Sequence, residues 1–311
     1  MHKKYHIIIN QSSGTVLRMG ADVLRQKIEE SGIDYASLSI VDSKDIYDTI
    51  DDVNNADDTD PLLVGGGDGT IKCAASILLN KENNKRPMCV LPLGTMNLMA
   101  HDMGIPINID DALTAYKSGS KIHKMDVGYV NDKMFLCCVA TGSIAKAAEL
   151  REEKRSENTP ALFAQLGLFL LENLDKKHWH RVKMHIGRKR YKFRSSALVI
   201  SNNIYIPAKE VKDITNLIRP KLDEGVLGIM SAKPYNMWDK LRFLSKIRLG
   251  NWRKDPVIRT WQGHTALIDI YNKSTSNMIT LDGEIIDMPP PYHFSLDPKA
   301  LTLASPVKEN T

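Results

Sequence analysis

The stretch VGGGDGT, which begins at Val64, surrounds one acidic residue, Asp68, with four glycines. Such a turn lets backbone N–H groups approach a phosphate, and a helix that starts there adds partial positive charge. A carboxylate would repel bare phosphate, but it suits a hydrated Mg²⁺ that bridges phosphates, because this ion prefers oxygen ligands and keeps several waters. The stretch therefore indicates binding of phosphate groups through a hydrated Mg²⁺. The alternative is a plain strand-to-helix turn in which Asp68 caps the helix and Thr70 lies in its first turn.

Five other segments combine apolar residues with glycine, amide or acidic residues. One of them, LDGE, also contains Asp-Gly between apolar flanks, which is a strong hairpin-turn signal whether or not the segment is a site. The segment LDEG is likewise compatible with an ordinary turn. The five are INQSSG (9–14), LPLGTMN (91–97), MDVGYV (125–130), LDEGVL (222–227) and LDGE (281–284).

Strands and helices alternate along the first 120 residues, and these elements must position the GGGDGT turn. Such alternation predicts a parallel, doubly wound sheet, whose ligands bind at the carboxyl ends of the strands. The predicted strands are 5–10, 37–41, 61–64 and 88–91, and the predicted helices are 16–31, closing on Gly32, then 45–55 and 70–80.

From about Lys121 the pattern changes to repeated strand-like segments, which favour an antiparallel β domain. Two helical stretches interrupt it, around Thr159 to Lys176 and around Tyr235 to Trp252. We predict an α/β domain over 1–121, with the chain end 296–311 as a candidate to return to it, and a β-rich, sandwich-like domain over 122–295. The strand-like segments are 123–130, 133–141, 179–186, 189–203, 225–232, 265–272 and 277–284.

Composition excludes several classes of protein. The chain has 311 residues, 42% of them hydrophobic, and no stretch reaches the ~18 apolar residues of a membrane span. The basic start, MHKKYHIIIN, lacks the apolar core and cleavage site of an export signal. The four cysteines, at 73, 89, 137 and 138, show no CxxC spacing, so neither a zinc site nor a disulfide framework is predicted. These features favour a cytoplasmic protein with reduced thiols.

The net charge of +5 is unevenly distributed along the chain. Residues 1–120 carry 11 Lys/Arg and 17 Asp/Glu, a balance of −6, whereas residues 121–311 carry 31 and 20, a balance of +11. Basic character confined to the later part suits an anionic partner there, and a solvated surface is the plain alternative. The basic segments lack a recognised nucleic-acid-binding motif, so nucleic acid is not expected as a partner.

The motifs GGGDGT, GTMN and LDGE resemble those of the diacylglycerol kinase catalytic domain family, which includes bacterial lipid kinases and is related to sphingosine kinases and, more distantly, to NAD kinases. NAD kinases share GGDGT, but their next glycine motif reads like LGFL, whereas here Gly94, Thr95 and Asn97 stand in a GTxN pattern. LDGE falls near the chain end, where the family places its catalytic acid. The three motifs together span most of the chain.

The resemblance implies ATP and Mg²⁺ as cofactors and a lipid as the acceptor, with chemistry in the cleft between a nucleotide-binding and a lipid-substrate domain. Phosphoryl transfer needs an in-line acceptor, neutralised phosphate oxygens and a base near the acceptor hydroxyl. Glu284 is the candidate base, and Asp68 is the second candidate catalytic residue. Candidate metal ligands are Asp68, Asp126 and Asp223. The residues implied to hold the nucleotide are Asn10, Ser13, Gly14, Gly65, Gly66, Gly67, Gly69, Thr70, Gly94, Thr95 and Asn97.

Two positions depart from the family pattern. Gln11 replaces the proline often found in the first loop, and Cys73 replaces a glutamate three residues after the threonine of GGDGT. The activity predicted is ATP-dependent phosphorylation of diacylglycerol or a related lipid. A kinase of a soluble acceptor such as NAD and a catalytically silent nucleotide- or lipid-binding regulator are the alternatives.

Residues 236–255, NMWDKLRFLSKIRLGNWRKD, would form a basic amphipathic helix. Helical spacing places Met237, Trp238, Leu241, Leu244 and Trp252 along one side and Arg242, Lys246 and Arg253 opposite. Such a helix suits the surface of an anionic bilayer, and a core-facing helix with a solvated basic side is the alternative. The expected partners are ATP, a lipid at a membrane surface bound peripherally, and a second copy of the chain as a possible homodimer.

Overall fold

The computed structural model describes residues 4–80, 86–145, 179–207, 217–271 and 277–307, so the helix predicted around Thr159 to Lys176 lies outside the described residues. The chain divides into two compact units. Unit 1 comprises Met1–Met125 and Lys299–Thr311, and unit 2 comprises Asp126–Pro298. The chain passes between them twice, within strand β5 (Ser120–Val130) and within strand β18 (Tyr292–Pro306).

Unit 1 contains the predicted parallel sheet. Strands β1, β2, β3 and β4 pair in the order β2-β1-β3-β4, every pair is parallel, and Leu303 of β18 pairs in parallel with Met88 of β4. The order reverses between β1 and β3, which makes the carboxyl ends of these two strands the switch point of the sheet. The bounds are β1 Tyr5–Asn10, β2 Tyr35–Val41, β3 Leu62–Gly66 and β4 Met88–Pro92.

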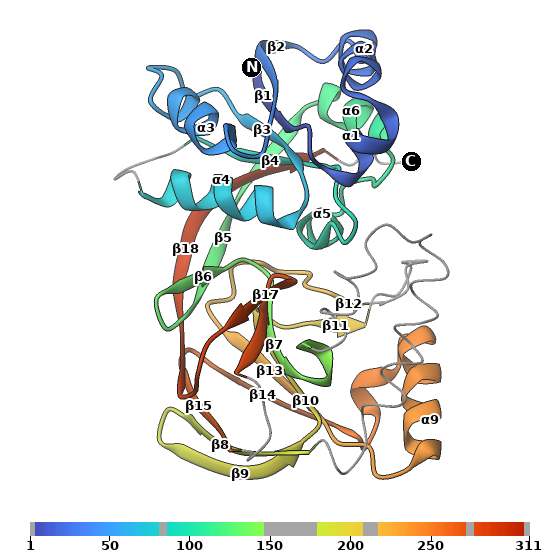
Figure 1. The fold of residues 1–311 in the computed structure, drawn as a ribbon, viewed down its shortest axis with the longest axis vertical. Coiled ribbons are helices and arrows are strands. Elements are labelled where there is room, and N and C mark those ends of the chain that lie inside the picture. The colour runs from blue at the N-terminus through green and yellow to red at the C-terminus, as the bar shows by residue number, and fades with distance from the viewer. Residues whose placement is uncertain (1–3, 81–85, 146–178, 208–216, 272–276, 308–311) are drawn as a thin grey trace. The chain divides into compact units, whose positions relative to one another are not determined.

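Helices flank both faces of this sheet, with α3 and α4 on one side and α1, α2 and α6 on the other (Figure 1). The apolar residues of β1 and β3 are fully buried between them. The predicted helix 16–31 is two helices, because Gly20 has a φ of 93° and interrupts the helical backbone. The bounds are α1 Gly14–Met19, α2 Ala21–Ser31, α3 Ile46–Asn54, α4 Asp68–Asn80, α5 Leu98–Met103 and α6 Ile109–Lys117.

Unit 2 is built from antiparallel sheets, as predicted. One has the order β14-β13-β10-β7-β16-β17, and a second contains β9, β8, β15 and the start of β18. The bounds in the first sheet are β14 Ile258–Gly263, β13 Leu227–Ala232, β10 Ala197–Asn202, β7 Cys138–Gly142, β16 Met278–Leu281 and β17 Glu284–Asp287. In the second they are β9 Lys189–Ser195, β8 His180–Ile186 and β15 Ala266–Tyr271.

The core of unit 2 lies between these two sheets. Val182 and Met184 of β8 join one cluster with Ile200 of β10, Ile229 of β13 and Ile279 of β16. Each fully buried aliphatic side chain contributes about 1.5–3 kcal/mol relative to exposure, so this shared cluster is what holds the sheets face to face. The predicted sandwich-like architecture is confirmed.

Two segments that were predicted as single strands each divide in two. Residues 133–141 form β6 (Lys133–Phe135) and β7, and residues 189–203 form β9 and β10 on either side of Ser196. Ser196 is buried, and its backbone N–H donates to Ala232 at 3.0 Å. In both cases the chain leaves one sheet and enters the other, which an apolar pattern along one segment does not reveal. The remaining strands are a short pair, β11 (Ile206–Pro207) and β12 (Leu217–Ile218).

Candidate functional site

Three loops meet at the carboxyl ends of β1, β3 and β4 in unit 1. The side-chain amide of Asn10, at the end of β1, donates to Thr70 Oγ1 in the GGGDGT loop at 2.9 Å. The backbone N–H of Thr15 donates to the carbonyl of Leu93, just before the GTMN motif, at 3.1 Å. The structure thus gathers at the switch point the three segments predicted to hold a nucleotide.

The glycines of these loops are required by close backbone contact. A Cβ added to Gly94 would lie 2.5 Å from the Cα of Gly67, and one added to Gly66 would lie 2.5 Å from the Cβ of Thr70. Both distances are far below van der Waals contact. Any side chain at Gly94 would therefore push the second glycine loop away from the first.

Asn97 closes the GTMN loop on itself. Its Oδ1 accepts from the backbone N–H of Gly94 at 2.9 Å, and its side-chain amide donates to the Gly94 carbonyl at 3.1 Å. The residue is buried and has a φ of 48°, a left-handed conformation that asparagine tolerates better than most residues. Thr95 projects from this loop toward Gly14, whose added Cβ would lie 3.9 Å from Thr95 Oγ1.

Ser13 provides a polar group that needs a partner. It immediately precedes α1, it is only 5% exposed, and its Oγ has no hydrogen-bond partner among the described residues. Buried hydroxyls are nearly always paired, so this oxygen points to a bound group with hydrogen-bonding atoms. A phosphate oxygen beside the adjacent glycine loops fits that requirement.

Asp68 links two of the loops. It is the first residue of α4, it is half-buried, and its Oδ1 accepts from the backbone N–H of Leu98 at 2.8 Å. The carboxylate thus bonds to the start of α5 in the next loop. This position keeps a negative charge at the junction of the loops, where a cation bound to phosphates would be stabilised.

Another group of side chains in unit 1, of the types that bind metals, is bonded to an arginine. His6, Asp58 and Asp60 lie close together, and the buried guanidinium of Arg86 donates to Asp58 Oδ1 at 2.8 Å and to the Asp60 carbonyl at 2.6 Å. Burial alone would raise the pKa of Asp58, but the hydrogen bonds from Arg86 and Asp60 outweigh it and lower the pKa to about 2. The cluster is an ion-paired structural contact.

The LDGE segment in unit 2 forms the predicted hairpin turn. Leu281 of β16 pairs with Glu284 of β17, and the two turn residues, Asp282 and Gly283, have φ values of 53° and 86°. The carboxylate of Asp282 accepts from the backbone N–H groups of residues 136, 137 and 138 at 2.7, 2.7 and 3.0 Å. The buried Asp282 therefore fixes the turn, and Glu284 begins the next strand with an exposed side chain.

Asp126 brings together the MDVGYV and LDEGVL segments of unit 2. It is fully buried, its Oδ2 accepts from the Gly225 N–H at 2.6 Å, and its own N–H donates to Leu222 at 2.7 Å. Asp223, in the same turn, is exposed. Asp126 thus fixes the turn that carries Asp223.

Sequence reasoning missed Arg219 and Asn202, which complete a network around these acids. Arg219 is fully buried and donates to the carbonyls of Leu136 at 2.6 Å and Asn202 at 2.7 Å. The side-chain amide of Asn202 donates to the Asp126 carbonyl at 2.5 Å. The same segment, 136–138, supplies the N–H groups to Asp282. A single arginine that follows a short strand carries no sequence pattern that could have indicated this role.

The helix predicted within 236–255 is present, but it ends at Arg248, so its predicted faces do not extend to Trp252 and Arg253. Helix α9 covers Met237–Arg248, and Trp252, in the turn η2 (Trp252–Lys254), is 2% exposed whereas Trp238 is 79% exposed. Arg242 and Lys246 bond to the buried Asp255, at 3.0 and 3.1 Å. The two cations are therefore turned toward Asp255. The side chain of Leu244 lies outside what the structure describes.

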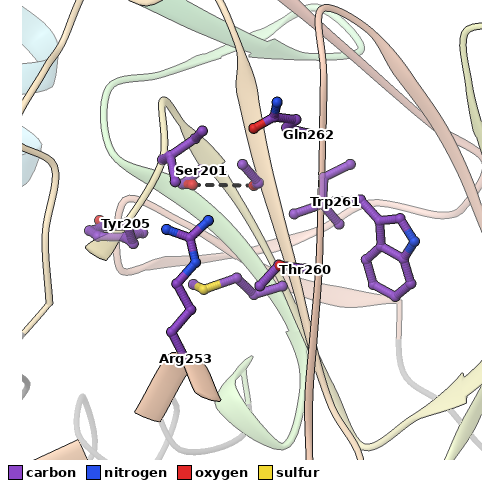
Figure 2. A pocket seen from close by; sticks show the side chains of 10 residues that line it. Ser201, Tyr205, Arg253, Thr260, Trp261 and Gln262 are labelled. Atoms are coloured by element: carbon purple, nitrogen blue, oxygen red, sulfur yellow. Dashed lines mark hydrogen bonds between the residues drawn. The ribbon is translucent and has the colours of Figure 1, made fainter. Parts of the chain in front are cut away.

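Arg253, the third cation of the predicted polar face, lies at a cavity of about 230 Å³ in unit 2 (Figure 2). Its guanidinium extends from η2 toward Ser201, whose hydroxyl bonds to the Gly228 carbonyl at 3.2 Å. Tyr205 and Thr260 also line the hollow. Because helix α9 has ended before Arg253, this side chain does not continue the face of the helix.

Comparison with known proteins shows which protein family the first part of the chain resembles. Residues 4–130 match the family model described as the diacylglycerol kinase catalytic domain. This range begins at β1 and includes all three loops that meet at the switch point. Residues 4–130 are therefore similar to a diacylglycerol kinase catalytic domain, and the resemblance predicted from the glycine motifs is confirmed.

Individual relatives agree with this domain match. A Yersinia enterocolitica protein named "Probable lipid kinase YegS-like" is 42% identical over 82 residues, 26% of this chain and 27% of that protein. The alignment thus spans about a quarter of that relative. A diacylglycerol kinase of Staphylococcus aureus is 24% identical over 91% of this chain and 87% of its own. The crystal structure of a diacylglycerol kinase from Bacillus anthracis has the same fold, with a TM-score of 0.69, 18% identity and 97% coverage of both chains.

Proposed function

We propose that this protein is an ATP-dependent lipid kinase that transfers the γ-phosphoryl group to a hydroxyl of diacylglycerol or a related lipid. The observation that carries the proposal is the meeting of three loops at the switch point of unit 1, with the orphaned hydroxyl of Ser13 among them. The catalytic-domain match and the lipid kinases similar to the chain support the reaction class.

The loops suit the phosphates of ATP. The glycines at 65–67, 69 and 94 allow backbone N–H groups to approach them, and α4, 13 residues long, directs its positive end at the same place. The Ser13 hydroxyl would donate to a phosphate oxygen, and the Asn10–Thr70 bond holds the two loops in register. Mg²⁺ bound near Asp68 would neutralise charge on the phosphates during transfer.

Glu284 is the proposed general base, which would accept the proton of the lipid hydroxyl as that oxygen attacks phosphorus. The three N–H groups bonded to Asp282 hold the turn that orients it. Asp126 and Asp223 are proposed as further metal ligands, with Asp126 also fixing the turn that carries Asp223.

A lipid acceptor implies work at a bilayer surface. In the part of the chain that the structure describes, no helix is long and apolar enough to cross a membrane. Since residues 121–311 carry a charge balance of +11, we propose that this part of the chain contacts the membrane surface peripherally.

The test is incubation of the purified chain with labelled ATP, Mg²⁺ and a panel of glycerolipids and sphingoid lipids in anionic mixed micelles, with NAD as a soluble acceptor. We expect label in one class of lipid, and loss of that label in Glu284→Gln. Label in NAD alone would replace the proposal with a soluble-acceptor kinase. Nucleotide binding without transfer to any acceptor would replace it with a silent regulator.

A further inference from the structure

The outer face of the β8–β9 hairpin is uniformly basic. Val182 and Met184 of β8 point into the core, and the alternating residues of both strands point outward. Between residues 180 and 194 the chain has seven Lys or Arg and no Asp or Glu. The outward residues are Arg181, Lys183 and His185 on β8 and Arg190, Lys192 and Arg194 on β9.

The register of the hairpin places these like charges directly opposite each other. Arg181 pairs with Arg194, Lys183 with Lys192, and His185 with Arg190. Like charges in directly opposed positions destabilise an antiparallel sheet. Asp269 of β15 lies opposite Lys183 and offsets part of this repulsion, and a negatively charged partner would relieve the rest.

Two cations from the other sheet extend this surface. Lys233 and Arg259 line one groove of about 630 Å³ together with Arg181, Lys192 and Arg194. In the described ranges, no carboxylate forms an ion pair with any of these five. We call Arg181, Lys183, Lys192, Arg194, Lys233 and Arg259 the cationic face.

An exposed apolar row adjoins the cationic face at Lys233. The Lys233 ammonium lies 4.7 Å from the ring centroid of Trp179 and 4.9 Å from that of Tyr235. The backbone N–H of Tyr235 donates to Asp239 in the first turn of α9 at 2.9 Å. We call Tyr235, Met237, Trp238 and Leu241 the apolar edge, and their side chains are 53%, 53%, 79% and 45% exposed.

We propose that the cationic face and the apolar edge together form the surface by which this protein docks on an anionic phospholipid bilayer. The cations would lie at the headgroup phosphates, and Trp238 and its neighbours would enter the interfacial layer, where aromatic side chains are favoured. The inference rests on the proposed lipid-kinase function, which requires access to a bilayer, and it assigns that access to these residues of unit 2.

The apolar edge favours a bilayer over a nucleic acid as the partner. Both carry phosphates that complement the cationic face. Only a bilayer also offers an apolar layer beside its phosphates, into which Met237 and Leu241 can insert. A nucleic acid can take single apolar side chains between its bases, but it offers no continuous apolar layer for the whole apolar edge.

The experiment compares co-sedimentation of the full chain with vesicles of phosphatidylcholine and with vesicles that also contain phosphatidylglycerol. We expect binding only to the anionic vesicles, decreasing as salt is raised. Lys192→Gln with Arg194→Gln should weaken vesicle binding about 10- to 30-fold, because each cation near the surface strengthens binding by about three- to fivefold. The matched control, Arg25→Gln with Lys121→Gln, removes the same charge from exposed sites in unit 1 and should bind as the parent does.

Trp238→Ala tests the apolar edge separately and should weaken vesicle binding several-fold while leaving the salt dependence unchanged. Thermal melting of all variants excludes unfolding, and removing Lys192 and Arg194 should not lower the melting temperature, because it relieves repulsion. Unchanged vesicle binding in the Lys192/Arg194 variant would overturn the docking assignment. Binding of the parent protein to RNA but not to anionic vesicles would overturn it as well.

Phosphorylation of a micelle-dispersed short-chain diacylglycerol separates this proposal from the kinase proposal. The docking variants should retain that activity and lose activity on vesicles. If no variant and no parent protein phosphorylates a lipid, but binding still depends on the cationic face, then docking stands and the kinase proposal fails. If turnover on vesicles is unaffected by the variants, the docking proposal fails and the kinase proposal stands.

Discussion

The dipeptide Asp-Gly occurs at two candidate sites and is used differently in each unit. In unit 1, Asp68 and Gly69 begin helix α4, and the half-buried Asp68 bonds to a neighbouring loop through the Leu98 N–H. In unit 2, Asp282 and Gly283 form a hairpin turn with positive φ, and the buried Asp282 accepts three backbone N–H groups.

The difference teaches which acid in each turn is available for chemistry. A buried carboxylate needs hydrogen bonds to remain charged, and Asp282 receives them from the backbone, so it acts on structure. Asp68 lies at the junction of the loops and Glu284 is exposed beside Asp282. We therefore propose a chemical role for Asp68 and Glu284 and a structural role for Asp282, and the following variants test that division.

The largest effect is expected from Glu284→Gln. Glutamine keeps the volume but cannot accept a proton, so turnover on lipid should fall about 10²- to 10⁴-fold, while ATP affinity and melting temperature stay near those of the parent. Turnover, ATP binding and melting are measured on one preparation. Asp287→Asn, which changes an exposed acid on the same strand, is the control and should remain active. Full activity of Glu284→Gln would sink the base assignment.

Asp68→Asn should also lower turnover, by about 10²- to 10³-fold, through loss of charge near the phosphates. Asparagine can still accept from the Leu98 N–H, so the loops and the free energy of unfolding should change little. The measurement is activity across a Mg²⁺ titration, together with denaturant unfolding. Near-normal turnover at saturating Mg²⁺ would refute the proposed role.

Asp282→Asn should show the opposite behaviour. Its amide group would face a backbone N–H, so one buried donor loses its acceptor, and the free energy of unfolding should fall by about 1–3 kcal/mol. Denaturant unfolding measures this loss. A variant with parental stability and strongly reduced turnover would reverse the division between Asp282 and Glu284.

Acid should destabilise the contact of α9 with Asp255. Burial alone would raise the pKa of Asp255, but hydrogen bonds from Arg242, the Val257 N–H and Lys246 outweigh it and lower the pKa to about 2. A pKa below that of the unfolded chain contributes stability above about pH 4, worth about 2 kcal/mol, which is lost as the pH falls toward 2. Asp255→Asn should remove this part of the acid dependence of unfolding, and an unchanged dependence would contradict the assignment.

Ser13→Ala should have the smallest effect and the most specific one. The hydroxyl has no protein partner among the described residues, so its removal should leave stability within about 0.5 kcal/mol of the parent. ATP affinity should fall about tenfold, because a hydrogen bond to a charged group is lost. Calorimetric titration with ATP checks this, and Ser12→Ala, in the same loop, is the control. Equal ATP affinity would show that the hydroxyl does not meet the nucleotide.

Much of unit 1 could be predicted from the sequence, because its signals are local. Buried strands followed by glycine turns and amphipathic helices define a doubly wound sheet wherever they occur. The motifs around Asn10, Gly66 and Gly94 follow consecutive parallel strands or strands that meet at the switch point, so their proximity follows from the topology. The break at Gly20 was missed because the sequence does not reveal whether a glycine within a helical pattern has a negative or a positive φ.

In unit 2 the sequence determined strand content and the LDGE turn, while tertiary structure decided which groups meet. The Cys137 N–H that bonds to Asp282 lies 145 residues away in the chain, and the contacts Arg219–Leu136 and Asp126–Gly225 join residues 83 and 99 apart. The burial of Trp252 and the exposure of Trp238 depend on where α9 ends and on Asp255, which binds Arg242 and Lys246. A periodic pattern records which residues share a side of a helix, but only the packed fold decides which side is covered.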